Sequence, residues 1–282
     1  MQVSKFIFLI VCVGTCFTRS HAAEGKWKVK ENLHQKEEEQ EAHQWDFLKK
    51  KLFNAIKYND VDYVNVLLEE YEELMFASCN VKLDSIISPK LGMMPLQYAA
   101  FLGRVRIVKI LLDKGAFRTW NREIGPKPLE WNEQNRSKPF GKTALHYACQ
   151  IVSPMPTLQS EYVRRTVIIR ELVEHGADVN VRDQHGQTPL HYAASGNHIP
   201  LMKALLQNDN IDVDVQDEQG WTPLFTAVAH GNITCAKLLL DYLADIRILA
   251  TDGESVIARA DRCIYDTTFF NELSANWDAR FS

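Results

Sequence analysis

The sequence has little of what metal sites, catalytic sites and nucleic-acid surfaces are usually built from. Its 282 residues include six cysteines, and no two form the Cys-x-x-Cys pair typical of zinc sites. No Gly-x-Ser-x-Gly, His-Glu-x-x-His or phosphate-loop motif is present, so we expect no enzyme, no cofactor and no metal site. The formal net charge of -4 leaves no basic excess, and we therefore expect no nucleic-acid binding.

Apolar runs are short as well. The run Phe6–Phe17 has about twelve residues, well below the roughly 20 that a membrane-spanning helix needs. It follows Lys5 and precedes the small residues of Ser20–Ala23, which is the layout of a secretory signal peptide. We therefore expect residues 1–23 to be a cleaved signal peptide, with an uncleaved anchor as the weaker alternative. After cleavage we expect no membrane contact.

What the sequence does contain is internal similarity. Four stretches share one pattern, and each is followed by a second apolar run. The stretches are Met94–Ala100 (MPLQYAA), Thr143–Cys149 (TALHYAC), Thr188–Ala194 (TPLHYAA) and Thr222–Val228 (TPLFTAV). Three of the four units then close on a small pair such as Gly176-Ala177. A repeated unit of this kind must stack on its neighbours, because a single pair of short helices cannot bury its own apolar face.

The pattern resembles the ankyrin repeat over about residues 45–282, because several Thr-Pro-Leu-His signatures occur in register. The resemblance implies an all-α fold, an ankyrin-repeat solenoid of stacked helix-turn-helix units with finger loops. Thr188 is expected to cap the first helix, Pro189 to occupy its first turn, and Gly176 to supply the left-handed turn after a second helix.

The spacing of the signatures locates the departures from a regular array. Thr188 and Thr222 lie 34 residues apart, whereas the two preceding intervals are 45 and 49 residues. The excess predicts insertions near residues 119–139, in a finger loop, and 152–165, between the two helices of one repeat. With degenerate repeats at both ends, we expect about six repeats after a polar lead-in at residues 24–44.

Histidines and aspartates within the pattern are interpreted as structural. The resemblance implies that His146 and His191 hydrogen-bond between adjacent loops. Asp183 and Asp217 each precede a finger loop and are expected to set a turn rather than to bind metal. Cys149 and Cys235 fall at buried helical positions and are expected to be free core thiols.

In the ankyrin family a partner binds the concave face, which comprises the finger tips and the exposed side of the first helices. The repeat register places on this face Met93, Phe101, Leu102, Phe140, Lys142, Gln150, Ile151, Gln184, His185, Gln187, Ser195, Glu218, Gln219, Trp221 and His230. The apolar members are unusual there and suggest binding, since large aromatic residues tend to dominate interface energies. For Phe101 and Phe140 an equal alternative is that the insertion, with Trp120 and Trp131, folds back over them.

Two sequons, at Asn135 and Asn232, are expected on the surface and would accept glycans in a secreted protein. We therefore expect a monomeric, non-catalytic protein-interaction scaffold that is secreted or resides in the secretory pathway. The alternative is a cytoplasmic or membrane-anchored adaptor or inhibitor, because most proteins with this repeat are intracellular. Ankyrin repeats bind unrelated targets, so the partner is not identified by the fold.

Overall fold

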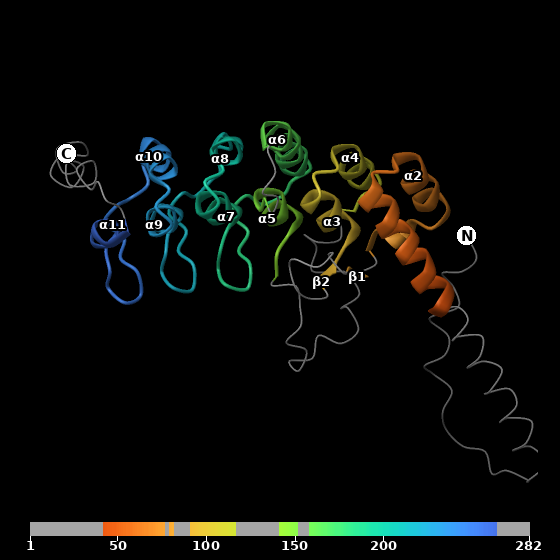
Figure 1. The fold of residues 1–282 in the computed structure, drawn as a ribbon, viewed down its shortest axis with the longest axis horizontal. Coiled ribbons are helices and arrows are strands. Elements are labelled where there is room, and N and C mark those ends of the chain that lie inside the picture. Colours follow the sequence, from red (N-terminus) through yellow and green to blue (C-terminus); the bar gives the residue numbers. More distant parts are fainter. Residues whose placement is uncertain (1–41, 77–78, 82–90, 117–140, 152–157, 264–282) are drawn as a thin grey trace, which may run out of the picture. The chain divides into compact units, whose positions relative to one another are not determined.

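A computed structural model of the chain describes residues 42–76, 79–81, 91–116, 141–151 and 158–263 (Figure 1). The chain divides into two compact units, Met1–Leu48 and Lys49–Ser282, and the helical repeats belong to the second. The expectations for residues 1–23, for the insertion at 119–139, and for Asn135 and Phe140 lie outside the described residues. Within the described ranges, no helix is long and apolar enough to cross a membrane.

Helix pairs of the second unit stack into two rows, which confirms the predicted all-α solenoid (Figure 1). Neighbouring helices of each row contact one another. The inner row consists of α3 (Pro95–Phe101), α5 (Ala144–Cys149), α7 (Pro189–Ser195), α9 (Pro223–Ala229) and α11 (Val256–Cys263). The outer row consists of α2 (Val61–Glu70), α4 (Val105–Asp113), α6 (Leu158–Glu174), α8 (Ile199–Leu206) and α10 (Ile233–Asp241).

Before α2, a helix runs over residues 42–58 and ends at Asn59, whose positive φ of 60° turns the chain. Asp60 then caps α2 by accepting a hydrogen bond from Tyr63 N at 3.1 Å. A short 3-10 helix, η1 (Glu72–Phe76), follows α2.

The inner helices are short because each needs only to fill one layer of the stack. Pro189 and Pro223 are the first residues of α7 and α9, where a missing N–H costs no hydrogen bond. Thr222 caps α9, its hydroxyl accepting from Phe225 N at 3.2 Å. The leucines that follow the prolines are fully buried, and buried alanines let neighbouring inner helices approach closely.

The segment around residues 152–165 differs from a simple inserted loop. Residues 158–165 form the N-terminal part of α6, which has 17 residues, whereas α8 has 8. The extra sequence therefore lengthens an outer helix in part, with consequences for the neighbouring helix ends described below.

A two-stranded antiparallel hairpin, β1 (Cys79–Val81) and β2 (Leu91–Met93), precedes α3 and has no counterpart in the predicted fold. Met93 pairs with Cys79 across this hairpin, and its side chain is fully buried. The repeat register therefore misplaces Met93, which does not belong to an exposed face. The prediction failed because it assumed a regular finger loop where the chain forms a small sheet.

Candidate protein-binding surface

Two finger loops are shaped by aspartates, as the sequence predicted. Asp183 accepts hydrogen bonds at one carboxylate oxygen, Oδ1, from the backbone N–H groups of His185 and Gln187, both at 2.9 Å. Asp217 does the same for Gln219 and Trp221, again at 2.9 Å. Each buried carboxylate thus closes a tight turn and fixes the backbone of the loop tip.

Neighbouring finger loops are joined by a row of side chains from the inner helices. The three bonds, each 2.9 Å long, run from Gln97 Nε2 to Lys142 O, from His146 Nε2 to Gln187 O and from His191 Nε2 to Trp221 O. This confirms the structural role predicted for the two histidines, and Gln97 performs the same role. The row stops at Phe225, which stands at the corresponding position of the next repeat and has no polar side-chain group.

Both histidines are held in the neutral state. Nδ1 of His146 accepts from Thr143 N at 3.0 Å, so Nε2 carries the proton that is donated to the next loop. Burial lowers the pKa of His146 to about 4, and it also lowers the pKa of His191. Both imidazoles therefore have a structural role, as neutral hydrogen-bonding groups between adjacent loops. Among the described residues, no group of three or more His, Cys, Asp or Glu is placed to hold a metal ion.

A second set of bonds crosses between the loops. Arg182 Nη2 donates to Gln216 O at 2.9 Å, and Gln216 Nε2 donates to Leu249 O at 3.0 Å. Backbone bonds run alongside, from Glu218 N to His185 O at 2.9 Å and from Thr251 N to Gln219 O at 3.0 Å. The finger loops are therefore ordered by the protein itself before any partner arrives.

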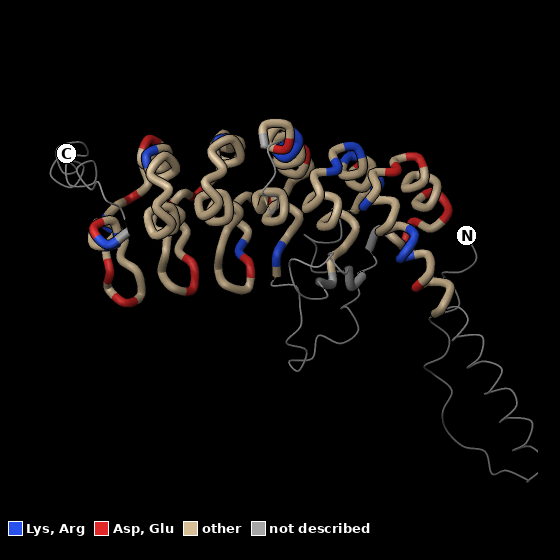
Figure 2. The backbone as a smooth tube through the Cα atoms, viewed as in Figure 1, with Lys and Arg blue, Asp and Glu red and all other residues tan. Residues whose placement is uncertain are grey.

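Several residues predicted to contact a partner have exposed side chains. Gln184, His185 and Glu218 are exposed at the loop tips, and His230 is exposed just after α9. Gln187 is half-buried, and its amide donates to Asp217 Oδ2 at 3.4 Å. The loop tips thus combine a fixed backbone with accessible polar side chains, and Figure 2 shows acidic residues along these loops.

The predicted apolar residues are less accessible. Phe101 and Ile151 are half-buried, and the Phe101 ring packs edge-on against Tyr147 with centroids 5.9 Å apart. Trp221 is also half-buried. Its ring lies 5.0 Å from the Phe225 ring, and the Arg259 guanidinium lies 5.2 Å from its centroid. Trp221 therefore already packs against residues of its own chain, which cover part of its ring and leave less of it accessible to a partner.

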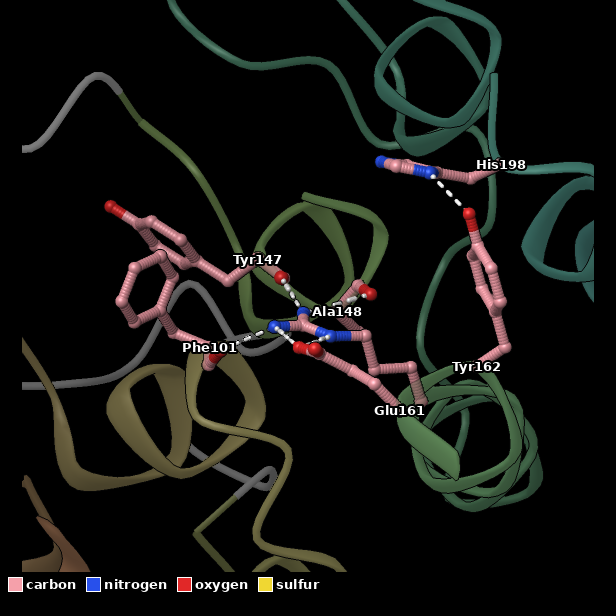
Figure 3. A network of polar contacts seen from close by, with 7 residues as sticks. Phe101, Tyr147, Ala148, Glu161, Tyr162 and His198 are labelled. Carbon is pink, nitrogen blue, oxygen red and sulfur yellow. Dashed lines mark hydrogen bonds and ion pairs between the residues drawn. The ribbon is translucent and has the colours of Figure 1, made fainter. Parts of the chain in front are cut away.

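Sequence reasoning missed Arg165, which organises the ends of two inner helices. Figure 3 draws its side chain without a label, joined by dashed lines to the labelled residues named below. Its side chain is almost fully buried, and Nη1 donates to Tyr147 O at 2.9 Å and to Ala148 O at 3.2 Å. Nη2 donates to Phe101 O at 2.7 Å, and Glu161 pairs with the same guanidinium at 3.0 Å. The signal for this role was indirect: Arg165 stands at the end of the predicted insertion.

Asn232 has a structural role that competes with its use as a sequon. Its amide nitrogen, the atom to which a glycan would be joined, donates to Ala194 O at 2.8 Å and to Ser195 O at 2.9 Å. These carbonyls end the inner helix of the preceding repeat. The amide is therefore occupied in the folded protein, which disfavours the glycan expected from the sequence pattern.

Cys149 and Cys235 are free and buried, as predicted. Burial raises the pKa of each thiol to about 12, so both stay protonated at neutral pH. They act as small core side chains rather than as reactive groups.

Family models match two parts of the chain. The model described as "Ankyrin repeats (3 copies)" covers residues 161–252, and the model "Ankyrin repeat" covers residues 91–119. The second range includes the signature of α3, and the first includes those of α7 and α9.

Curated proteins similar to this chain are each matched over only part of their length. A putative ankyrin repeat protein of Rickettsia bellii is 30% identical over 125 residues, which are 44% of this chain and 52% of that protein. The putative ankyrin repeat protein FPV115 of fowlpox virus is 34% identical over 169 residues, 58% of this chain and 30% of that protein.

The ADP-ribosylation factor GTPase-activating protein AGD4 of Arabidopsis thaliana is 37% identical over 71 residues, 25% of this chain but 8% of that protein. This match lies in the repeat region. The chain thus spans about half or less of the length of these relatives. The stacked helix pairs, the bonded finger loops and the matching family models together place the chain in the ankyrin repeat family.

Proposed function

We propose that this protein is a non-catalytic scaffold that holds a protein partner against its finger loops and the exposed side of its inner helices. The observation that carries the proposal is the combination of a fixed loop backbone with exposed tip side chains. Asp183 and Asp217 fix the two turns, while Gln184 and Glu218 stand exposed between the turn residues.

Preordering matters because ordering a loop during association costs free energy. Immobilising a rotamer-rich side chain costs about 0.5–1.5 kcal/mol, and ordering the backbone adds to this. In this chain the folding of the solenoid has already ordered the backbone of residues 183–187 and 217–221, through hydrogen bonds of 2.9 Å. More of the contact energy made by the tips is then available as affinity.

The test compares two double variants of the full chain. Gln184→Arg with Glu218→Arg changes the loop tips, whereas Lys203→Ala with Gln207→Ala changes exposed residues of the outer helix α8 and just beyond it. Tagged proteins capture partners from the source cells, and quantitative mass spectrometry compares the amounts. We expect at least one protein to be retained by wild type and by the outer-row variant but reduced about tenfold or more by the tip variant. Equal recovery of every protein by the two variants would contradict the proposal.

Entry into the secretory pathway is a separate proposal, supported by the signal-peptide layout of residues 1–23. Expression of the tagged chain in eukaryotic cells should place protein in the medium with an N-terminus near residue 24. Retention in the cytoplasm, with the chain still starting at Met1, would contradict this and favour the intracellular adaptor.

Glycosylation is tested in the same cells. Thr234→Ala removes the second sequon without touching the amide of Asn232, so we expect the mass of the secreted protein to change only by the substitution itself. A loss of one glycan mass in this variant would show that Asn232 is glycosylated before it forms the bonds to its two carbonyl partners, and would contradict this expectation.

A further inference from the structure

Three arginine side chains gather where the α3–α4 turn meets the lengthened part of α6. Arg104 is the residue before α4, and a Cβ atom on the adjacent Gly103 would lie 3.8 Å from Arg164 Nε. Burial lowers the pKa of Arg104 and that of Arg165, and the nearby charge of Arg164 lowers both pKa values further. We refer to Arg104, Arg164 and Arg165 as the arginine cluster.

Among the residues that the structure describes, one member of the arginine cluster is paired with a carboxylate. Glu161 pairs with Arg165 at 3.0 Å. Arg104 donates from Nη2 to Lys57 O at 2.5 Å, and its buried Nε has no hydrogen-bond partner. In the part of the chain that the structure describes, no carboxylate lies within ion-pair distance of Arg104 or Arg164. Within the described ranges, two positive charges of the cluster therefore have no carboxylate partner.

Contacts with the described residues do not account for the position of Arg164. Its side chain is exposed and makes no hydrogen bond or ion pair with the described residues. It nevertheless lies beside Gly103, the neighbour of Arg104, and its positive charge lowers the pKa of both Arg104 and Arg165. Adjacent like charges destabilise a folded chain, and this chain has more acidic than basic residues available for pairing, 36 against 32. Figure 2 shows basic residues on both α4 and α6.

We propose that Arg104 and Arg164 form a docking site for an acidic segment of a protein partner, one that carries closely spaced Asp or Glu side chains. Guanidinium groups present paired donors that match a carboxylate, and charge-assisted bonds of this kind are stronger than neutral ones. A protein segment is favoured over a free anion because ankyrin repeats act as protein-interaction scaffolds. The site lies at the inter-helix turns rather than at the finger tips, so it goes beyond the proposed concave-face function.

The test uses fluorescence anisotropy with the full chain and a labelled synthetic peptide of alternating glutamate and serine, with a glutamine-for-glutamate peptide as its control. The matched variants are Arg164→Gln and Arg170→Gln, both exposed positions on α6 that lose the same charge. We expect Arg164→Gln to weaken binding of the acidic peptide about fivefold more than Arg170→Gln does. The affinity should also fall as salt rises, less steeply for Arg164→Gln.

Three outcomes would overturn the proposal. The acidic peptide fails to bind wild type at low salt, or both variants lose the same affinity, or inorganic phosphate displaces the peptide at concentrations comparable to that of the peptide itself. The last result would assign a small-anion site instead of a peptide site. None of these outcomes bears on the finger-tip variants, so failure here and failure of the concave-face function are distinguishable.

Discussion

The guanidinium of Arg165 and the backbone carbonyl of Phe101 are joined by a hydrogen bond of 2.7 Å across 64 residues of sequence (Figure 3). The bond connects an outer helix to the end of the inner helix of the preceding repeat. Glycine follows the inner helices at Gly103, Gly196 and Gly231, but Gln150 follows α5. Arg165 satisfies the carbonyls at this irregular helix end, so the stack continues through the insertion.

Replacing Arg165 should therefore destabilise the whole stack. Arg165→Met leaves three carbonyls without their charged donor and leaves Glu161 without its partner, so we expect the free energy of unfolding to fall by about 3 kcal/mol. Urea denaturation followed by circular dichroism measures this. The exposed neighbour provides the control, since Arg164→Met should change stability by less than about 0.5 kcal/mol. Equal effects of the two substitutions would show that the Arg165 bonds contribute little.

In the row of loop-to-loop bonds, glutamine already takes the place of histidine in one repeat. Gln97 occupies the position of His191 and makes the equivalent bond at 2.9 Å. We expect His191→Gln to cost less than about 1 kcal/mol, whereas His191→Ala should cost about 2 kcal/mol because Trp221 O and Thr188 N lose their partner. Thermal unfolding of both variants tests this, and a glutamine variant as unstable as the alanine variant would be the contrary result.

Stability should also depend on pH through buried histidines. Burial lowers the pKa of His146 and that of His198 to about 4, below the value of 6.5 for an unperturbed histidine. Since the unfolded chain binds protons that the folded chain does not, the free energy of unfolding is highest above about pH 6.5 and falls as the pH drops toward 4.

Between pH 7 and pH 5 each of these two histidines should lower the free energy of unfolding by about 2 kcal/mol. Urea denaturation at the two pH values measures the change. His146→Gln should reduce the dependence by one histidine's share, and an identical pH dependence in that variant would exclude His146 as a contributor.

Trp221 and Arg259 should be energetically coupled, because the guanidinium lies 5.2 Å from the centre of the indole ring. In a double-mutant cycle with Trp221→Ala and Arg259→Ala, we expect a coupling free energy of about 0.5–1 kcal/mol. From the repeat register alone, Trp221 was interpreted as a partner-binding residue of the concave face. The packing against Phe225 and Arg259 predicts that Trp221→Ala also lowers stability measurably. Strict additivity of the two substitutions in the cycle would argue against the coupling of Trp221 and Arg259.

The regular part of the fold was predictable because the helix starts and turns of each repeat are determined by residues close in sequence or in the adjacent repeat. Thr188, Pro189 and His191 define a helix start, and Asp183 defines a turn, all through interactions within five residues or with the adjacent repeat. The same local logic placed Gln184 and Glu218 on exposed loop tips.

The features that sequence reasoning missed depend on contacts between distant segments. Arg165 lies in a stretch with no repeat signature, and its bonding to Phe101 follows only from the packing of α6 beside two inner helices. Met93 was misplaced because a hairpin replaces the expected loop, and Trp221 appeared more accessible than it is because Arg259 comes from the following repeat.

Neighbouring inner helices contact one another although their signatures begin 49, 45 and 34 residues apart in sequence. A recognition patch that spans two rungs of the stack is therefore discontinuous in the chain. No short synthetic peptide copied from this protein would reproduce such a patch, and antibodies raised against linear fragments would not report on it. Mapping of any partner footprint consequently requires the folded stack, with surface substitutions or hydrogen exchange in place of peptide arrays.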